Sequence, residues 1–268
     1  MITEQDLGIS TACLYPIDTE KALQVFLDMG FRVFEVFVNA YQEFSPAFMK
    51  KLKNLADEYG AVFTSVHPFT SPMESMLLFE RYERRTEEGI ELYKRFMNSA
   101  ALLGAKYLVI HGKHEKRLGK LADTHEEEQY WETFGRLYRA GHDIGAYPIQ
   151  ENVFSHKSQD PRFILGMREY LQNDCAFVLD TKQCRMSDVP IENMIKAMGE
   201  RLCHLHISDC DETSACLVPG YGAYDFGQLF SLLNSMHYQG KLVTEVYRSS
   251  YRKIDEIAES RRRMKKWF

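Results

Sequence analysis

The sequence predicts an α/β protein, a single (β/α)₈ barrel that spans residues 1–268 as one domain. Three observations predict this fold. Short apolar runs alternate with longer helical segments, and the alternation repeats eight times. The apolar runs are nearly continuous, as expected of parallel strands that are buried on both faces. The length of 268 residues suits one such barrel, and no linker or shift in composition marks a domain boundary.

The predicted strands are short apolar runs. In chain order they are Leu7–Leu14, Arg32–Val38, Ala61–Val66, Ala105–Ile110, Ala146–Gln150, Cys175–Leu179, Leu202–Ile207 and Lys241–Val246. A doubly wound open sheet would show the same alternation of strands and helices. The count of eight units favours the barrel, and so does the lack of a Gly-rich phosphate loop after the first strand.

The longer segments between and after the strands are predicted to be helices. Ser45-Pro46 is a typical helix start, and Gly60 then ends that helix. Thr19 is the expected N-cap of the first helix, and Gly30 is its expected stop. The predicted helices are Thr19–Gly30, Ser45–Tyr59, about Glu74–Leu103, Glu126–Ile144, Pro161–Leu171, Ile191–Arg201, Phe226–Met236 and Ile254–Lys266.

Composition narrows the class of protein. No apolar run approaches the roughly 20 residues that cross a membrane, and the segment Met1–Ser10 lacks the pattern of a secretory signal. The net charge of −5 and the pI of about 6.0 disfavour a nucleic-acid partner. The six cysteines form no C-x-x-C pair, and a chain of this length needs no disulfides. We therefore expect a cytoplasmic protein.

Candidate functional residues stand at the ends of six consecutive strands, the third to the eighth. They are His67, His111, Glu151, Asp180, His206 and Glu245. In a (β/α)₈ barrel the carboxyl ends of all strands face one mouth, so these residues are expected to converge there. Any one of them alone has an ordinary explanation, as a helix cap or a packed histidine. Their occurrence in register on successive strands favours a functional site.

Electrostatic repulsion between the carboxylates predicts a bound metal ion. Glu151, Asp180 and Glu245 would place three like charges in one narrow mouth, and without a cation at least one of them should hold a proton. A divalent cation removes this conflict. Carboxylates with one imidazole suit Mn²⁺, Zn²⁺, Co²⁺ or Mg²⁺.

Three further residues lie close to this set in the sequence. His204 precedes His206 by two residues, so it should point the same way one layer deeper in the barrel. Asp209 is expected to orient a ligand histidine or to bind substrate. Glu35 lies inside the second strand among apolar residues, and a buried carboxylate there needs a partner.

The motifs at the strand ends occur in a fixed order along nearly the whole chain. They are Gln-Glu-Asn at 150–152, Leu-Asp-Thr at 179–181, His-Leu-His-Ile-Ser-Asp at 204–209, Pro-Gly-Tyr-Gly-Ala-Tyr-Asp-Phe at 219–226 and Leu-Val-Thr-Glu-Val at 242–246. This set resembles the xylose isomerase-like TIM barrel superfamily, in particular its sugar phosphate isomerase/epimerase branch. The resemblance implies that Glu151, Asp180, His206 and Glu245 bind one divalent metal. It also implies that Glu151 and Glu245 transfer protons through a metal-bound enediolate.

The sequence departs from the family pattern after the sixth strand. Many relatives carry Asp-x-x-His there, whereas this chain has Gln183 in place of the histidine and Lys182 before it. In the abasic-site endonucleases of the superfamily that histidine helps to hold a three-zinc cluster, so its loss favours a single metal. The residues expected to bind substrate are His67, His111, Lys182, Gln183 and Asp209.

The leading functional prediction is a metal-dependent isomerase or epimerase in carbohydrate metabolism. Its substrate would be a small sugar, sugar phosphate or polyol-like ketone. The alternatives are a zinc hydrolase like the abasic-site DNA endonucleases, a dehydratase or lyase of the same superfamily, and a relative that binds without catalysis. Relatives often form homo-oligomers, although the sequence reveals no interface.

Overall fold

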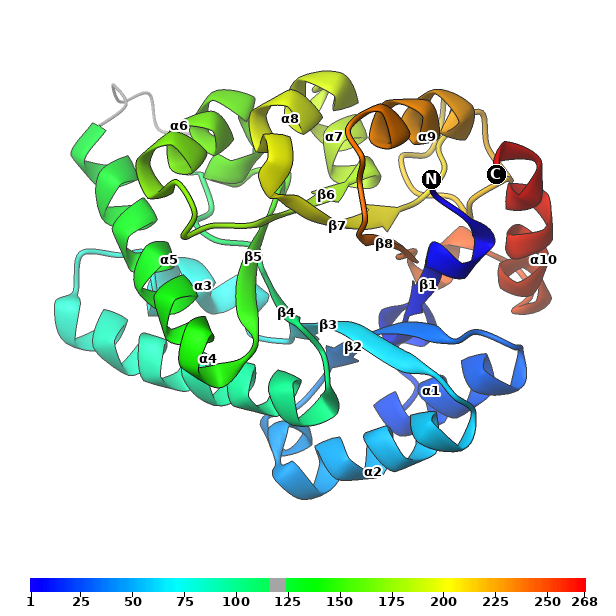
Figure 1. Ribbon diagram of the computed structural model, residues 1–268, viewed down its shortest axis with the longest axis horizontal. Helices are drawn as coiled ribbons and strands as arrows, with labels where there is room; N and C mark the ends of the chain where they lie inside the picture. Colours follow the sequence, from blue (N-terminus) through cyan, green and yellow to red (C-terminus); the bar gives the residue numbers. More distant parts are fainter. Residues whose placement is uncertain (116–123) are drawn as a thin grey trace.

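Eight parallel strands close into a barrel in the computed structural model, which describes residues 1–115 and 124–268 (Figure 1). The strands are β1 Leu7–Ser10, β2 Val33–Val38, β3 Val62–Pro68, β4 Tyr107–Ile110, β5 Tyr147–Glu151, β6 Phe177–Asp180, β7 Leu202–Ile207 and β8 Lys241–Thr244. Each strand pairs in parallel with the next, and β8 pairs with β1 to complete the ring. The predicted fold class is confirmed.

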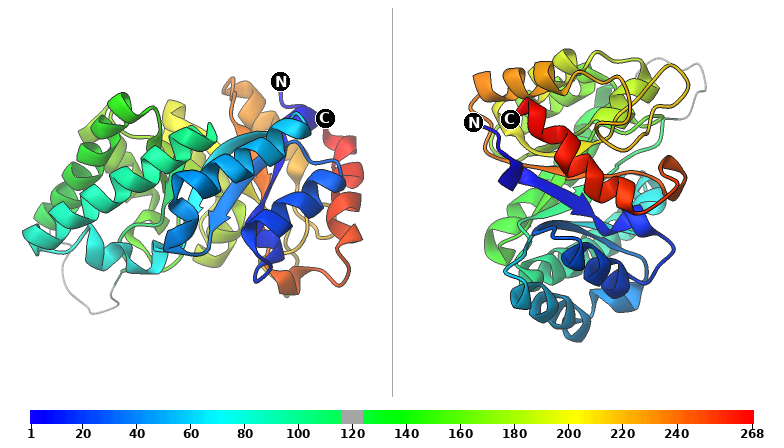
Figure 2. Two further views of the ribbon diagram at one scale, coloured as in Figure 1. Left: turned by 90° about the horizontal axis from the view of Figure 1, so that it is seen from below. Right: turned by 90° about the vertical axis from the view of Figure 1, so that its right-hand side faces the viewer.

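Helices surround the strands, as two further views show (Figure 2). The α-helices are α1 Thr19–Asp28, α2 Pro46–Glu58, α3 Glu74–Leu77, α4 Glu83–Leu103, α5 Thr124–Ile144, α6 Pro161–Leu171, α7 Thr181–Ser187, α8 Ile191–Met198, α9 Phe226–Ser235 and α10 Asp255–Met264. Short 3-10 helices occupy Glu4–Asp6, Thr11–Leu14, Tyr41–Phe44, Ser71–Met73, Lys157–Gln159, Gly199–Arg201, Arg248–Ser250 and Lys265–Trp267. Among the helices of the described ranges, none combines the length and the apolar character needed to cross a bilayer.

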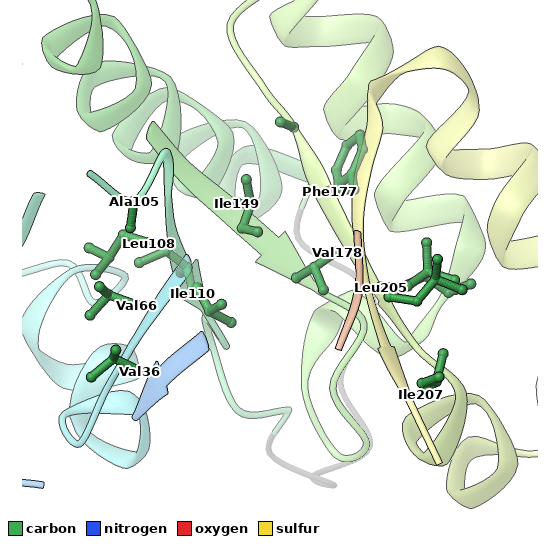
Figure 3. Packing of buried hydrophobic residues seen from close by; sticks show 14 of the residues in the cluster. Val36, Val66, Ala105, Leu108, Ile110, Ile149, Phe177, Val178, Leu205 and Ile207 are labelled. Atoms are coloured by element: carbon green, nitrogen blue, oxygen red, sulfur yellow. The ribbon is translucent and has the colours of Figure 1, made fainter. Parts of the chain in front are cut away.

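The core lies between the strands and the surrounding helices. Val36, Val66 and Leu108 are in register on β2, β3 and β4, are fully buried, and lie next to one another (Figure 3). Leu205 and Ile207 project from the same side of β7 (Figure 3). Because successive side chains of a strand point to opposite faces, the residues between these apolar positions point into the barrel. That alternation sends polar side chains of β2, β3 and β7 toward one another.

Several element boundaries differ from the prediction. The first strand stops at Ser10, because the Ser10 side chain accepts a hydrogen bond from the Ala12 N–H and the chain turns into a 3-10 helix. The predicted helix over 74–103 is two helices, α3 and α4. The turn between them buries Leu78 and Phe79, and the Phe79 ring stacks on another aromatic ring with the centroids 3.9 Å apart. Burial of these side chains explains the break.

The helix-end signals are partly confirmed. Ser45 caps α2 by accepting a hydrogen bond from the Phe48 N–H, and Pro46 occupies the first helical position as predicted. The N-cap of α1 is Asp18 rather than Thr19, so that expectation was wrong. The Thr19 hydroxyl is engaged elsewhere, because it donates a hydrogen bond to Glu43 Oε2 at 3.0 Å.

Candidate metal centre

The structure brings the four predicted ligand residues together. Glu151 and Asp180 are the last residues of β5 and β6, His206 lies near the end of β7, and Glu245 directly follows β8. One potential ligand atom from each lies within 4.8 Å of the others. The side chains of Glu151, Asp180 and His206 are almost completely buried, and that of Glu245 is 13% exposed. The carboxyl ends of four adjacent strands therefore form one polar pocket.

Polar atoms that lack a hydrogen bond in this pocket fit a bound cation. Glu151 Oε2, Asp180 Oδ2 and His206 Nδ1 are buried, and the described residues give none of them a hydrogen-bond partner. Leaving a buried polar group unpaired costs about 1–3 kcal/mol, and more for a charged group. Three carboxylates with one imidazole are a ligand set for Mn²⁺, Zn²⁺, Co²⁺ or Mg²⁺. The residues present therefore fit a divalent metal.

Lys182 lies among the same carboxylates. Its Nζ is 3.0 Å from Glu245 Oε2 and 3.3 Å from Asp180 Oδ2, and it lies 4.9 Å from the centre of the Tyr247 ring. The Lys182 side chain is only 5% exposed. The sequence places Lys182 near the mouth but gives no indication of this pairing. Asp180 and Glu245, two of the three carboxylates whose repulsion predicts a metal, thus already have a cationic neighbour.

The charged groups in the pocket shift one another's pKa values. Burial raises the pKa of Asp180 to about 7, assisted by the charges of Glu151 and Glu245 and opposed by Lys182. Burial acts to raise the pKa of Glu245 as well, but Lys182 and His206 outweigh it and lower that pKa. Burial acts to lower the pKa of Lys182, whereas the neighbouring carboxylates hold that pKa well above its ordinary value. Lys182 and Glu245 are therefore an ion pair at neutral pH.

Glu35 holds His206 from inside the barrel. His206 Nε2 lies 2.9 Å from Glu35 Oε2, while His206 Nδ1 faces Glu151 Oε1 at 3.5 Å and Glu245 Oε2 at 3.6 Å. A hydrogen bond from Nε2–H to a carboxylate fixes the ring and leaves Nδ1 for a metal. The sequence indicated only that Glu35 needs a partner. The partner is His206, 171 residues away.

A second polar layer lies beneath His206. The Ser65 hydroxyl donates a hydrogen bond to Glu35 Oε2 at 2.7 Å and lies 3.1 Å from His204 Nε2. Glu35, Ser65 and His204 are all fully buried. Burial acts to raise the pKa of Glu35, but His206 and His204 outweigh it and lower that pKa well below its ordinary value. His204 thus lies one layer deeper than His206, as the sequence predicts.

Two histidines approach Glu151 from β3 and the end of β4. His67 Nε2 lies 2.9 Å from His111 Nε2, and His111 Nε2 lies 3.0 Å from Glu151 Oε2, although that contact lacks the angle of a hydrogen bond. His67, His111 and Glu151 also meet the distance criterion for a metal site, and this second group shares Glu151 with the first. Burial acts to raise the pKa of Glu151, but His111 and His206 lower it well below its ordinary value.

The side chains of Gln183 and Asp209 both accept hydrogen bonds from backbone N–H groups. Gln183 Oε1 accepts a hydrogen bond from the Phe154 N–H at 2.9 Å, and the Gln183 N–H donates to Asp180 Oδ1 at 3.1 Å. The Asp209 carboxylate accepts four backbone N–H groups, from residues 210, 220, 222 and 224, each at 2.8–2.9 Å. Both side chains hold backbone in place, and the expected contacts of Gln183 and Asp209 with substrate stay a prediction.

Two features that position the ligands were not predicted. Helix α7 begins immediately after β6, with Asp180 as its N-cap, which fixes the Asp180 carboxylate and brings Lys182 into the pocket. Asn152 joins β5 to β6, because its side chain donates to the Asp180 carbonyl at 3.2 Å and accepts from the Asp180 N–H at 2.7 Å. The available signals were the polar residues next to Asp180 and the Gln-Glu-Asn run at 150–152.

Comparisons with known proteins agree with the barrel fold. A family model described as "Xylose isomerase-like TIM barrel" matches residues 23–267. An uncharacterized protein of Mycobacterium leprae (strain TN) is 24% identical over 266 residues, which cover 93% of this chain and 91% of that protein. The solved structure of D-psicose 3-epimerase with D-tagatose, from Clostridium cellulolyticum H10, has a TM-score of 0.80 at 17% identity and covers 97% of both chains. AP endonuclease, family 2, from Brucella melitensis has a TM-score of 0.70 at 15% identity and covers 90% of this chain and 92% of that chain.

At such low identity the solved structures establish the fold alone, and sugar epimerases recur among them. The family model extends over nearly the whole chain and includes β2 to β8, from which all the residues of the pocket come. The chain belongs to the xylose isomerase-like TIM barrel family.

Proposed function

We propose that this protein is a metal-dependent isomerase or epimerase of a small sugar, sugar phosphate or polyol-like ketone. The observation that carries the proposal is the gathering of potential ligand atoms of Glu151, Asp180, His206 and Glu245 within 4.8 Å. Two of these residues are glutamates that reach the pocket from β5 and β8, on either side of β6 and β7. Sugar 3-epimerases among the structural neighbours support the same reaction class.

Glu151, Asp180, His206 and Glu245 would hold the ion, which is Mn²⁺, Zn²⁺, Co²⁺ or Mg²⁺. When bound, the divalent ion supplies a positive charge that acidifies the carbon-bound proton next to a ketose carbonyl. Glu35 orients the His206 ring for this role. Asn152 and the α7 N-terminus fix the Asp180 carboxylate.

The two glutamates differ in their neighbours, and we assign their roles on that basis. In the metal-free pocket Glu245 lies 3.0 Å from the Lys182 ammonium, which lowers the pKa of Glu245. A bound cation would keep Glu245 ionised in the same way, so that Glu245 can remove a proton. Glu151 lies 3.0 Å from His111 Nε2 and 3.8 Å from His67 Nε2, and from this side it would deliver a proton to the opposite face of the substrate. In the reverse direction the two roles exchange. His67 and His111 would also contact substrate hydroxyl groups at this side of the mouth.

Solvent deuterium tests the proposal. Metal-free protein should be incubated in D₂O with a panel of ketoses and ketose phosphates, before and after addition of Mn²⁺ or Co²⁺. We expect deuterium at carbon and interconversion of at least one ketose pair only after metal is added. Glu151→Gln and Glu245→Gln should each abolish this exchange, whereas the exposed Glu58→Gln should not. Deuterium that enters no substrate of a broad panel would contradict the proposal.

A zinc hydrolase is the second candidate, because His67, His111 and Glu151 form a second potential metal group. This candidate predicts about three zinc ions per chain and cleavage of DNA at abasic sites. The net charge of −5 and Gln183 in place of the usual histidine oppose it. Elemental analysis of the purified protein and an abasic duplex assay separate the two functions. A product lighter by one water would instead identify a dehydratase.

A further inference from the structure

We propose that the Lys182 ammonium occupies the metal site in the metal-free protein. It competes with the metal for Asp180 and Glu245, and it moves away from them when the metal binds. The inference rests on the proposed metal site and adds a property of this chain's own sequence. It assigns Lys182 a positioning role that controls metal affinity. Metal uptake would then require a movement of one side chain.

The contacts of Lys182 place its charge on predicted metal ligands. Its Nζ donates a hydrogen bond to Glu245 Oε2 at 3.0 Å and lies 3.3 Å from Asp180 Oδ2. Asp180 Oδ2 is one of the buried oxygens to which the described residues give no hydrogen bond. With 5% of its side chain exposed, Lys182 has little access to water in this position. The ammonium therefore depends on these two carboxylates for its charge balance.

A metal ion cannot bind Asp180 and Glu245 with full affinity while the Lys182 ammonium contacts the same carboxylates. Metal–oxygen bonds to Asp and Glu are about 2.0–2.2 Å long, so a metal on Glu245 Oε2 would lie within roughly 5 Å of the present Nζ position. A +1 and a +2 charge at that distance repel strongly in a buried site. Either the metal binds more weakly than it would without Lys182, or the ammonium moves away.

Lys182 has a route by which to leave. It is the second residue of α7, so its backbone is fixed while its four-carbon side chain can rotate. The Tyr247 ring lies 4.9 Å from Nζ, and Tyr247 is 53% exposed. An ammonium that rotates outward over this ring keeps a cation–π contact as it reaches solvent. No backbone rearrangement is required.

Metal affinity tests the competition. Mn²⁺ should be titrated calorimetrically into metal-free wild type, Lys182→Met, Lys182→Arg and Lys241→Met. Lys241 is the matched control, because it begins β8 at the opposite end of the barrel and pairs with Asp6. We expect the Kd for Mn²⁺ to fall at least tenfold in Lys182→Met and to stay within about threefold of wild type in the other two. An unchanged or higher Kd in Lys182→Met overturns the inference while leaving the metal site intact. If neither wild type nor Lys182→Met binds Mn²⁺, the metal site and the inference both fail.

Acetylation of the wild-type protein tests the movement without any substitution that affects folding. Lysine acetylation, quantified by mass spectrometry, should be compared in metal-free protein and in protein saturated with Mn²⁺. We expect the acetylation rate of Lys182 to rise at least fivefold with the metal, because its ammonium leaves the pocket, while that of Lys241 stays constant. An acetylation rate of Lys182 that is unchanged or lower with Mn²⁺ overturns the inference.

Discussion

Replacing Glu35 with Gln should weaken metal binding although Glu35 is not one of the four proposed ligands. Glu35 is fully buried, and its Oε2 receives the Ser65 hydroxyl at 2.7 Å and His206 Nε2 at 2.9 Å. Gln has the same shape, and its amide oxygen can still accept both hydrogen bonds. The substitution therefore removes the negative charge and leaves the packing in place.

The expected magnitude follows from the change in hydrogen-bond type. A hydrogen bond to a charged group contributes about 1.5–3 kcal/mol, and one between neutral groups about 0.5–1.5 kcal/mol. The difference of about 1–1.5 kcal/mol corresponds to a roughly tenfold change in Kd. Loss of a carboxylate partner of a metal-binding histidine typically costs about 10–100-fold in affinity, which includes this value. We expect the Kd for Mn²⁺ to rise about tenfold in Glu35→Gln.

Calorimetric titration with Mn²⁺ measures this effect, and thermal unfolding of each protein shows that the fold persists. Glu58→Gln is the control, because it replaces a carboxylate with an amide in the same way at an exposed position on α2. Its Kd should equal that of wild type. A folded Glu35→Gln protein whose Kd stays within twofold of wild type would refute the reasoning, since the Glu35–His206 contact would then have no influence on the metal.

Three further predictions concern stability. In metal-free protein burial acts to lower the pKa of His206, but Glu35 and Glu245 hold it well above the ordinary 6.5. The stability that this contributes is full below pH 6.5 and is lost as the pH rises through the raised pKa, so the Tm should fall as the pH is raised above neutrality. An equally steep fall in His206→Gln would contradict this. Asp209→Ala leaves four backbone N–H groups without an acceptor and should lower the free energy of unfolding by about 3 kcal/mol in urea denaturation; a loss under 1 kcal/mol would argue against it. Ser45→Ala removes the α2 cap and should cost about 1 kcal/mol by the same assay, with Ser45→Asn retaining most of the stability.

The fold and the convergence of the four candidate ligands were accessible from the sequence for one physical reason. Parallel strands of a closed barrel all end at the same mouth, so a residue at a strand end can be placed without knowledge of its neighbours. Glu151, Asp180 and His206 illustrate this, because each lies on the last or next-to-last residue of its strand. The first strand ended four residues early and other strand boundaries shifted by one or two residues, but the order of the strands preserved the convergence.

Features that depend on contacts between distant side chains were not accessible. The Glu35–His206 contact joins β2 to β7 across the barrel, and no local pattern encodes it. The position of Lys182 depends on α7, a seven-residue helix that follows β6 without a loop. Asp209 was expected to orient a ligand histidine or to bind substrate, and the sequence did not reveal that backbone N–H groups of its own loop contact both of its oxygens. The turn between α3 and α4 likewise depends on burial of Phe79 against a ring from α5.

The central claim is that one divalent cation occupies the pocket where β5, β6, β7 and β8 end. Anomalous diffraction from crystals grown with Mn²⁺ tests it most directly. We predict one manganese peak per chain, bounded by oxygens of Glu151, Asp180 and Glu245 and by His206 Nδ1, with the Lys182 ammonium displaced. The claim would be contradicted by the absence of a peak there while the Lys182 ammonium remains between Asp180 and Glu245. A peak only among His67, His111 and Glu151 would contradict it equally.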